Sequence, residues 1–278
     1  MIRKLFLSIL FLFIPVSQSA IFGDGDPSNG IEDQRHLASS PFLKAVGTIF
    51  CDGGLRGTAT HISTSPKKGP AIILTAAHVL FDQNTGLEFR HCVYRPENRR
   101  LSEIDFAAVS THQYQSFSKN KIRQSETDIV FVALNKKSYQ ASLTLAMAIN
   151  SSEDNLQLLG YNIDSQEINL SNNCGSFESD FFVSEQLLLH NCDALGGSSG
   201  GPIIGTIEGG EARSIIAVHG GTLSSGASDG NSLNADRAAG AEVNPEQWIN
   251  QARKIDRAIL NQLQQFLAYL AKDFPSQK

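Results

Sequence analysis

The sequence has no excess of positive charge. Its 278 residues include 23 Lys and Arg against 28 Asp and Glu, so the formal net charge is -5 at pH 7. Nucleic-acid-binding surfaces need a basic excess that neutralises phosphates, so this balance argues against a nucleic-acid partner. The length and the 18% of charged residues fit a foldable globular protein of one or two domains.

Beyond its N-terminus the sequence also lacks an apolar stretch of the roughly 20 residues that a membrane-spanning helix needs. The N-terminus combines Arg3 and Lys4 with an apolar run at 5–14 and a small, polar exit at 15–20. This pattern is typical of a secretory signal peptide that is cleaved near Ser19 or Ala20. We therefore expect residues 1–20 to be removed and the mature protein to be secreted or periplasmic, with no membrane span left.

Cysteine is scarce, and the four cysteines lack metal-binding spacing. No Cys-x-x-Cys pair occurs, which argues against a zinc site, and no cofactor is implied. The acidic turn at residues 24–26 is better explained as a solvated turn than as a calcium site. An even number of cysteines in an exported chain predicts two disulfides.

Short apolar or β-branched runs, separated by Gly, Asn, Ser and Asp clusters, predict an all-β protein. The runs that fit strands are 45–51, 57–63, 71–75, 129–134, 156–161, 181–183, 187–190, 202–207 and 214–219. After Pro245 the apolar residues recur at helical spacing, with Asn244-Pro245 as a start signal. We expect an amphipathic helix over 247–271 that packs against the second half of the fold.

Three short motifs carry the residue types of a nucleophilic site. Ser199 lies between glycines that allow a sharp, exposed turn, His78 follows the apolar run at 71–74, and Asp128 precedes the run at 129–134. A serine hydroxyl is a poor nucleophile unless a base and an orienting carboxylate accompany it. The chain order is His, Asp, Ser, which excludes the Ser, Asp, His order of α/β-hydrolases.

These motifs resemble those of the chymotrypsin-like (trypsin-fold) serine peptidases, which read roughly Thr-Ala-Ala-His, Asp-Ile-Ala-Leu and Gly-Asp-Ser-Gly-Gly-Pro. The spacings of about fifty and about seventy residues between the three also fit. The resemblance covers roughly residues 21–248 and implies two packed six-stranded antiparallel β-barrels with a C-terminal α-helix. The expected boundaries are 21–145 for the first barrel, 146–245 for the second, and 246–278 for the helix and tail.

The resemblance implies a secreted serine endopeptidase. Ser199 would attack the peptide carbonyl, His78 would act as the general base, and Asp128 would orient the imidazole. The backbone amides of Gly197 and Ser199 would form the oxyanion hole. Protein or peptide substrates and a monomeric state are expected. The alternative is a catalytically weak or inactive secreted binding protein on the same scaffold, although all three triad residues are present.

Two features near the motifs need an interpretation. Asp105 also heads an apolar run, but the spacing favours Asp128, which follows a segment, His112-Gln113-Tyr114, similar to the family's His-Pro-Tyr. Ser198 replaces the aspartate that pairs with the new N-terminal amine in trypsin-like zymogens. We therefore predict no ion-pair zymogen switch, and either a preformed site or activation by removal of residues from the 21–35 segment.

Specificity has two conflicting indications. Asp193 lies six residues before Ser199, where trypsin keeps the acid of its primary pocket, and this predicts cleavage after Arg or Lys. The segment around His219 is similar to that of the glutamyl endopeptidases, in which a pocket histidine meets a substrate carboxylate, and this predicts cleavage after Glu. We slightly favour His219.

The four cysteines allow three pairings. We favour Cys51 with Cys92 and Cys174 with Cys192, because each pair then closes a loop within one half of the molecule. Val79 stands where trypsin has a cysteine after its catalytic histidine. The chain therefore looks more like the bacterial trypsin-like peptidases, in particular the glutamyl endopeptidase branch.

Overall fold

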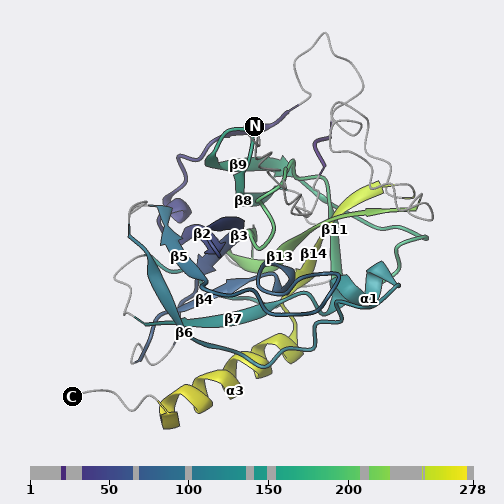
Figure 1. Ribbon diagram of the computed structural model, residues 1–278. Coiled ribbons are helices and arrows are strands. Elements are labelled where there is room, and N and C mark those ends of the chain that lie inside the picture. Colours follow the sequence, from purple (N-terminus) through teal and green to yellow (C-terminus); the bar gives the residue numbers. More distant parts are fainter. Residues whose placement is uncertain are drawn as a thin grey trace, which may run out of the picture.

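The computed structural model describes residues 20–22, 33–64, 69–97, 102–135, 141–148, 155–206, 213–225, 246 and 248–273. These residues form two β-sheet units and one long helix near the C-terminus (Figure 1), which confirms the all-β class. Residues 1–19 of the predicted signal peptide lie outside the described residues.

The first unit is a closed barrel of six antiparallel strands in the order β2-β3-β4-β7-β6-β5. Its strands are β2 (Val46–Cys51), β3 (Gly54–His61), β4 (Ile72–Thr75), β5 (Val93–Pro96), β6 (Ile104–Val109) and β7 (Val130–Leu134). The apolar strands β4 and β7 are fully buried and pair with each other, with Thr75 opposite Val130. This register places the end of β4, which leads to His78, beside the start of β7, which follows Asp128.

The second unit is a curled sheet of eight strands in the order β1-β9-β8-β12-β13-β14-β11-β10. Its strands are β1 (Arg35–Leu37), β8 (Leu156–Asn162), β9 (Glu167–Cys174), β10 (Ser176–Phe177), β11 (Leu187–His190), β12 (Pro202–Thr206), β13 (Arg213–Ser224) and β14 (Trp248–Lys254). Where the sequence predicts a second six-stranded barrel, the structure has this curled sheet of eight strands, with β1 and β10 at its edges. The expected boundary at 21–145 is corrected for β1, because Arg35 pairs with Ser171 of β9.

The C-terminal region contains a strand where the sequence predicts the start of a helix. β14 lies between β13 and β11, and residues 248–253 are all buried. A strand that is covered on both faces loses the alternation that distinguishes it from a buried helix, which explains the error. Helix α3 (Arg257–Asp273) begins after Asp256, whose Oδ1 accepts a hydrogen bond from the Ile259 amide at 2.9 Å. Within the described ranges no helix is long and apolar enough to cross a membrane.

Helix α3 contacts the first barrel rather than the second half alone. It runs alongside β6 and β7 (Figure 1), and Gln262 Nε2 donates to the Thr111 carbonyl at 2.7 Å, just after β6. The structure also has a short helix, α1 (Lys121–Glu126), and two 3₁₀ turns, η1 (Pro41–Ala45) and η2 (Ala77–Val79), none of which the sequence predicts. Conversely, the run at 181–183 is not a strand.

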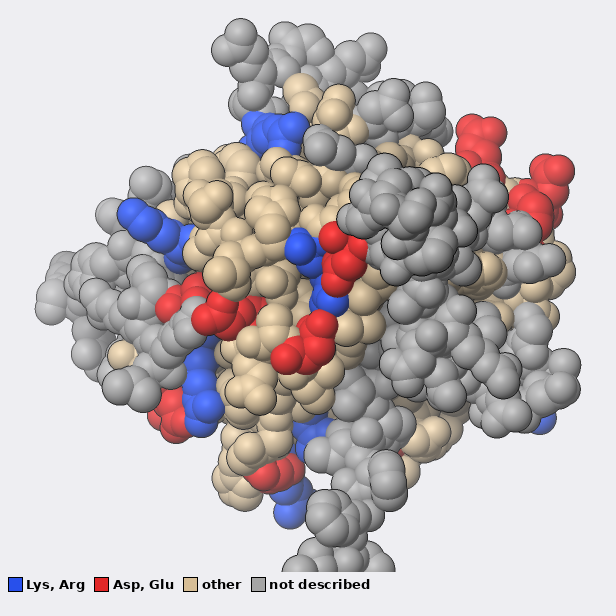
Figure 2. Space-filling model, turned by 90° about the horizontal axis from the view of Figure 1, so that it is seen from above, with Lys and Arg blue, Asp and Glu red and all other residues tan. Residues whose placement is uncertain are grey.

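Both favoured disulfides are present. Cys51 bonds to Cys92 within the first barrel, and Cys174 bonds to Cys192 within the second sheet. The surface seen in Figure 2 has basic and acidic side chains of the described residues lying close to one another among uncharged ones. On this face the described charges therefore form no large patch of a single sign.

Candidate active site

His78 and Asp128 meet at the point where β4 and β7 lie side by side. Asp128 Oδ2 is 2.6 Å from His78 Nδ1, and Oδ1 accepts a hydrogen bond from the His78 backbone amide at 2.8 Å. Both side chains are buried, with 5% and 6% of their surface exposed. A carboxylate can only accept at this distance, so Nδ1 carries a proton and Nε2 is the nitrogen that faces away from Asp128.

Ser199 lies in the loop between β11 and β12. Its Oγ is buried and, like His78 Nε2, makes no hydrogen bond with the described residues. The Ser199 carbonyl oxygen accepts from the Thr58 amide of β3 at 2.7 Å. A Cβ on the neighbouring Gly57 would lie 2.6 Å from that oxygen and 2.7 Å from Val79 Cγ2. The serine loop and the turn that carries His78 are thus packed against the same point of β3.

The turn before Ser199 carries the two amides that the sequence assigns to the oxyanion hole, those of Gly197 and Ser199. Gly197 has a φ of +99°, a conformation that favours glycine. The amides of Gly197 and Ser199 are not among the donors of the hydrogen bonds formed between described residues. Between them, the amide and the hydroxyl of Ser198 both donate to the Leu195 carbonyl, at 3.1 and 2.6 Å, and close the turn locally.

Thr58 holds this turn from the first barrel. Its hydroxyl donates to the Gly197 carbonyl at 2.8 Å and accepts from the Tyr161 amide at 2.9 Å, while its own carbonyl accepts from the Thr75 hydroxyl at 2.7 Å. The amide, the hydroxyl and the carbonyl of Thr58 therefore all form hydrogen bonds at the site. No motif in the sequence signals this residue, because its role depends on contacts between distant segments.

His219 lies on β13 beside the serine loop. Its carbonyl accepts from the Gly200 amide at 2.8 Å, and its amide donates to the Gly201 carbonyl at 2.9 Å. Its side chain is completely buried, with Nδ1 3.1 Å from Nε2 of His190, a residue that the sequence does not single out.

The backbone fixes the proton positions in this histidine pair. The Cys192 amide donates to His190 Nδ1 at 3.2 Å, so His190 Nδ1 is unprotonated and its proton is on Nε2. That proton is donated to His219 Nδ1, which leaves the His219 proton on Nε2. Burial lowers the pKa of His190 to about 3. Burial also lowers the pKa of His219 well below its usual range, and the nearby His190 and His78 lower it further. At neutral pH both rings are uncharged, and His219 is a hydrogen-bond donor through Nε2.

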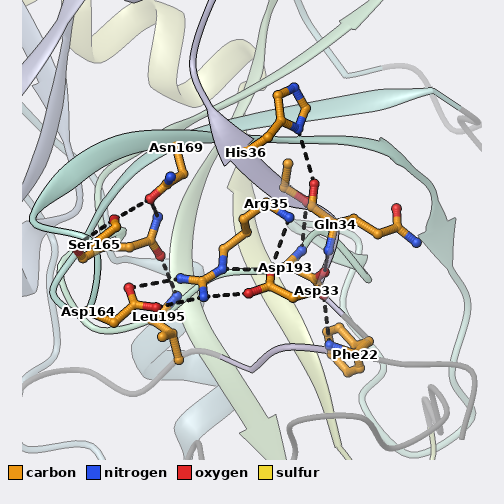
Figure 3. Close-up of polar contacts among 12 residues, drawn as sticks. Phe22, Asp33, Gln34, Arg35, His36, Asp164, Ser165, Asn169, Asp193 and Leu195 are labelled. Atoms are coloured by element: carbon orange, nitrogen blue, oxygen red, sulfur yellow. Dashed lines mark hydrogen bonds and ion pairs between the residues drawn. The ribbon is translucent and has the colours of Figure 1, made fainter. Parts of the chain in front are cut away.

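Asp193 is buried and faces the N-terminal part of the chain. Its Oδ1 accepts from the Phe22 amide and its Oδ2 from the Gln34 amide, each at 2.7 Å (Figure 3). Burial raises the pKa of this carboxyl to about 6. The rival acid Asp105 is exposed on β6, and it is Asp128 that contacts His78.

Comparisons with known proteins give matches in structure but not in sequence: no family model and no curated protein matches the chain. A Glu endopeptidase in complex with MPD superposes with a TM-score of 0.63 at 13% identity, over 90% of this chain and 100% of that one. The thermostable serine protease AL20 from an extremophilic microorganism gives 0.54 at 16% identity, over 83% and 98%. Protease Anisep from Arthrobacter nicotinovorans gives 0.54 at 13% identity, over 91% and 100%. The chain therefore has the two-unit β fold of the chymotrypsin-like serine proteases.

Proposed function

We propose that this protein is a serine endopeptidase that uses His78, Asp128 and Ser199 as its catalytic triad. The observation that carries the proposal is the two-point contact of Asp128 with His78, which fixes both the ring orientation and its tautomer. The buried Ser199 hydroxyl, which makes no hydrogen bond with the described residues and lies on a loop packed against β3 together with the His78 turn, supports it.

The proposed reaction follows from the positions of the protons. Ser199 Oγ attacks the peptide carbonyl while its proton passes to His78 Nε2, and Asp128 stabilises the resulting imidazolium. The amides of Gly197 and Ser199 bind the oxyanion of the tetrahedral intermediate. The imidazolium then protonates the leaving amine, and an acyl-enzyme on Ser199 remains. Water, deprotonated by His78, releases the second product and restores the hydroxyl.

We further propose that His219, and not Asp193, recognises the substrate side chain before the cleaved bond. A neutral imidazole with its proton on Nε2 donates to an acidic side chain, which favours cleavage after Glu. Both oxygens of Asp193 accept backbone amides, which disfavours their use in binding Arg or Lys. The similarity of the fold to a Glu endopeptidase is in keeping with this choice.

We also propose that the protein is exported from the cytoplasm. The signal-like N-terminus would direct the chain to an oxidising compartment, and the two disulfides are compatible with an extracellular or periplasmic location.

Active-site labelling tests the proposal. A fluorophosphonate should label the purified mature protein and the Ser102→Ala control, whose altered serine is exposed and outside the site, but not Ser199→Ala. Asp128→Asn should lower kcat by about 10⁴, as expected when the imidazole tautomer is no longer fixed, while the control Asp105→Asn should leave it unchanged. A well-folded wild-type protein that is not labelled would favour a latent zymogen or the binding-protein alternative, and one that stays unlabelled after removal of residues from the 21–35 segment would reject the peptidase.

Cleavage of a mixed peptide library tests the specificity. Cuts after Glu that are lost in His219→Ala would support the role of His219. Cuts after Arg or Lys would instead support Asp193 and overturn the choice.

A further inference from the structure

We propose that Asp193 is a positioning residue for the oxyanion loop, residues 195–199, which it secures by clamping the N-terminal segment, residues 21–22 and 33–37. The proposal rests on the proposed function, because it concerns the two amides assigned to the oxyanion. It assigns Asp193 a role in turnover rather than in the choice of substrate.

The clamp consists of one carboxylate and two backbone amides. The amides of Phe22 and Gln34 each donate to a different oxygen of Asp193, both at 2.7 Å (Figure 3). Hydrogen bonds from an amide to an ionised carboxylate are stronger than those between neutral groups. A single side chain thus holds two points of the chain that are separated by residues 23–32.

The first of these points is also fixed by packing. The Phe22 ring stacks on Trp248 with 4.9 Å between centroids, within a buried apolar cluster. Asn250 of β14 accepts from the Ala20 amide at 3.0 Å and donates to the Ala20 carbonyl at 2.9 Å. Its side-chain amide nitrogen also donates to the Cys192 carbonyl, so Asn250 bridges Ala20 to the residue before Asp193. This bridge is present in the mature protein when cleavage follows Ser19.

The second point is fixed by β1. Arg35 pairs with Ser171 of β9, and its guanidinium lies between Asp33 and Asp164 at 2.7 and 2.8 Å (Figure 3). Only 6% of the Arg35 side chain is exposed. Ser171 Oγ in turn accepts from the Asp193 amide at 2.9 Å, so β9 links the backbone of Asp193 to the strand that follows Gln34.

The clamp leads directly into the oxyanion loop. The Ala194 amide donates to the Ala20 carbonyl at 3.1 Å, and the Leu195 amide donates to Asn162 Oδ1 at 2.8 Å. Asp193 is therefore held by the N-terminal segment and Leu195 by Asn162, and the Ala194 contact is added when signal cleavage follows Ser19. Leu195 then anchors Ser198 through two hydrogen bonds, and this fixes the turn that carries the amides of Gly197 and Ser199.

The variant Asp193→Asn distinguishes a positioning role of this residue from a role in the choice of substrate. Asparagine keeps one acceptor oxygen but presents an amino group to the other backbone amide. Because the oxyanion donors act mainly in the transition state, Asp193→Asn should lower kcat at least tenfold, with KM within twofold and the preferred substrate residue unchanged. A changed residue preference with kcat retained on the new best substrate would place Asp193 in the substrate pocket and overturn the proposal.

A second pair of variants removes one backbone donor without touching the carboxylate. The Gln34 side chain is exposed, so Gln34→Ala retains the amide, whereas Gln34→Pro deletes it. We expect Gln34→Pro to lose kcat several-fold and Gln34→Ala to match the wild type. Equal kcat values for the two variants would contradict the clamp, even if Asp193→Asn does not fold.

Hydrogen exchange separates failure of the clamp from failure of the proposed function. Peptides that cover residues 194–199 should exchange several-fold faster in Gln34→Pro than in Gln34→Ala, whether or not the protein hydrolyses peptides. A wild type that is labelled by fluorophosphonate but shows no such difference between variants rejects the clamp. A wild type that is not labelled, together with faster exchange in Gln34→Pro, rejects the peptidase and retains the clamp.

Discussion

The backbone amide of Thr58 donates a hydrogen bond to the carbonyl oxygen of Ser199 at 2.7 Å. The hydroxyl of the same threonine reaches the Gly197 carbonyl, so one residue of the first barrel contacts both residues of the candidate oxyanion hole. The orientation of the two amides is thus set partly from outside the sheet that carries them.

Thr58→Val should impair turnover more than substrate binding. Valine has a similar shape but removes the partner of the buried Gly197 carbonyl, at a cost of about 1–3 kcal/mol, and the Thr58 acceptor of the part-buried Tyr161 amide. We expect kcat to fall about tenfold to a hundredfold with little change in KM, measured by steady-state kinetics. Thr58→Ser, which keeps the hydroxyl, is the control. A Thr58→Val variant with wild-type kcat would show that this hydroxyl does not position the turn.

Acid should destabilise the fold through His190. Its pKa of about 3 in the folded protein lies below the 6.5 of an unperturbed histidine, so between these values the unfolded chain binds a proton that the folded chain does not. The stability contributed by His190 is therefore present above pH 6.5 and is lost as the pH falls towards 3. His190→Gln cannot titrate, so from pH 6.5 to 4.5 it should lose about 2 kcal/mol less unfolding free energy than the wild type, as measured by urea denaturation.

The comparison between these two proteins also removes the contribution of Asp193. The raised pKa of that carboxyl, about 6, acts in the opposite direction, because its folded form binds the proton more tightly than the unfolded chain. It acts equally in both proteins. Identical losses of stability in wild type and His190→Gln would show that His190 is not held neutral.

Removing the two disulfides should have different effects on stability and on activity. The Cys51–Cys92 link spans 41 residues and the Cys174–Cys192 link spans 18, so chain entropy predicts losses of about 4 and about 3 kcal/mol when each pair is replaced by alanines. Loss of the Cys174–Cys192 link should slow fluorophosphonate labelling more than loss of the Cys51–Cys92 link, because Cys192 directly precedes Asp193. A slower labelling rate for the Cys51/Cys92 double variant would contradict the importance of this segment.

Asp256 should affect stability alone. Its carboxylate caps α3 through the Ile259 amide and pairs with Arg253 at 2.8 Å. Asp256→Ala should lower the free energy of unfolding by about 1–2 kcal/mol, whereas Asp256→Ser, which can still cap the helix, should recover part of that loss. Thermal unfolding and kcat measured on the same samples would check this, and a fall in kcat would show that α3 communicates with the site.

The parts of the fold that the sequence predicts are those in which local pattern and tertiary environment agree. Compact apolar runs such as 71–75 and 129–134 form strands, and the Cys pairs form as favoured. The sequence pattern gave a wrong prediction at β14, because burial on both faces removes the alternation typical of a strand. It did not predict β1, because these three residues have no apolar pattern and form a strand only by pairing with β9.

For the candidate site, too, the sequence predicts some of the residues and misses others. His78 and Asp128, which the motifs single out, lie in contact. Thr58 and His190 were missed because each acts through a partner that lies far away in the chain, and a single sequence gives no sign of such a contact. Asp193 was noticed for its distance from Ser199, but its surroundings come from the N-terminal segment, which spacing alone does not place.

The strands of the second sheet come from residues as far apart as Arg35 and Lys254. The first barrel, by contrast, needs only residues 46–134, so it can close while the rest of the chain is still being made. The half that carries Ser199 must wait for β14, which fills the gap between β13 and β11. In the proposed peptidase, a partly made chain would therefore have its base but no assembled nucleophile, and this order of assembly would delay hydrolysis until β14 is in place.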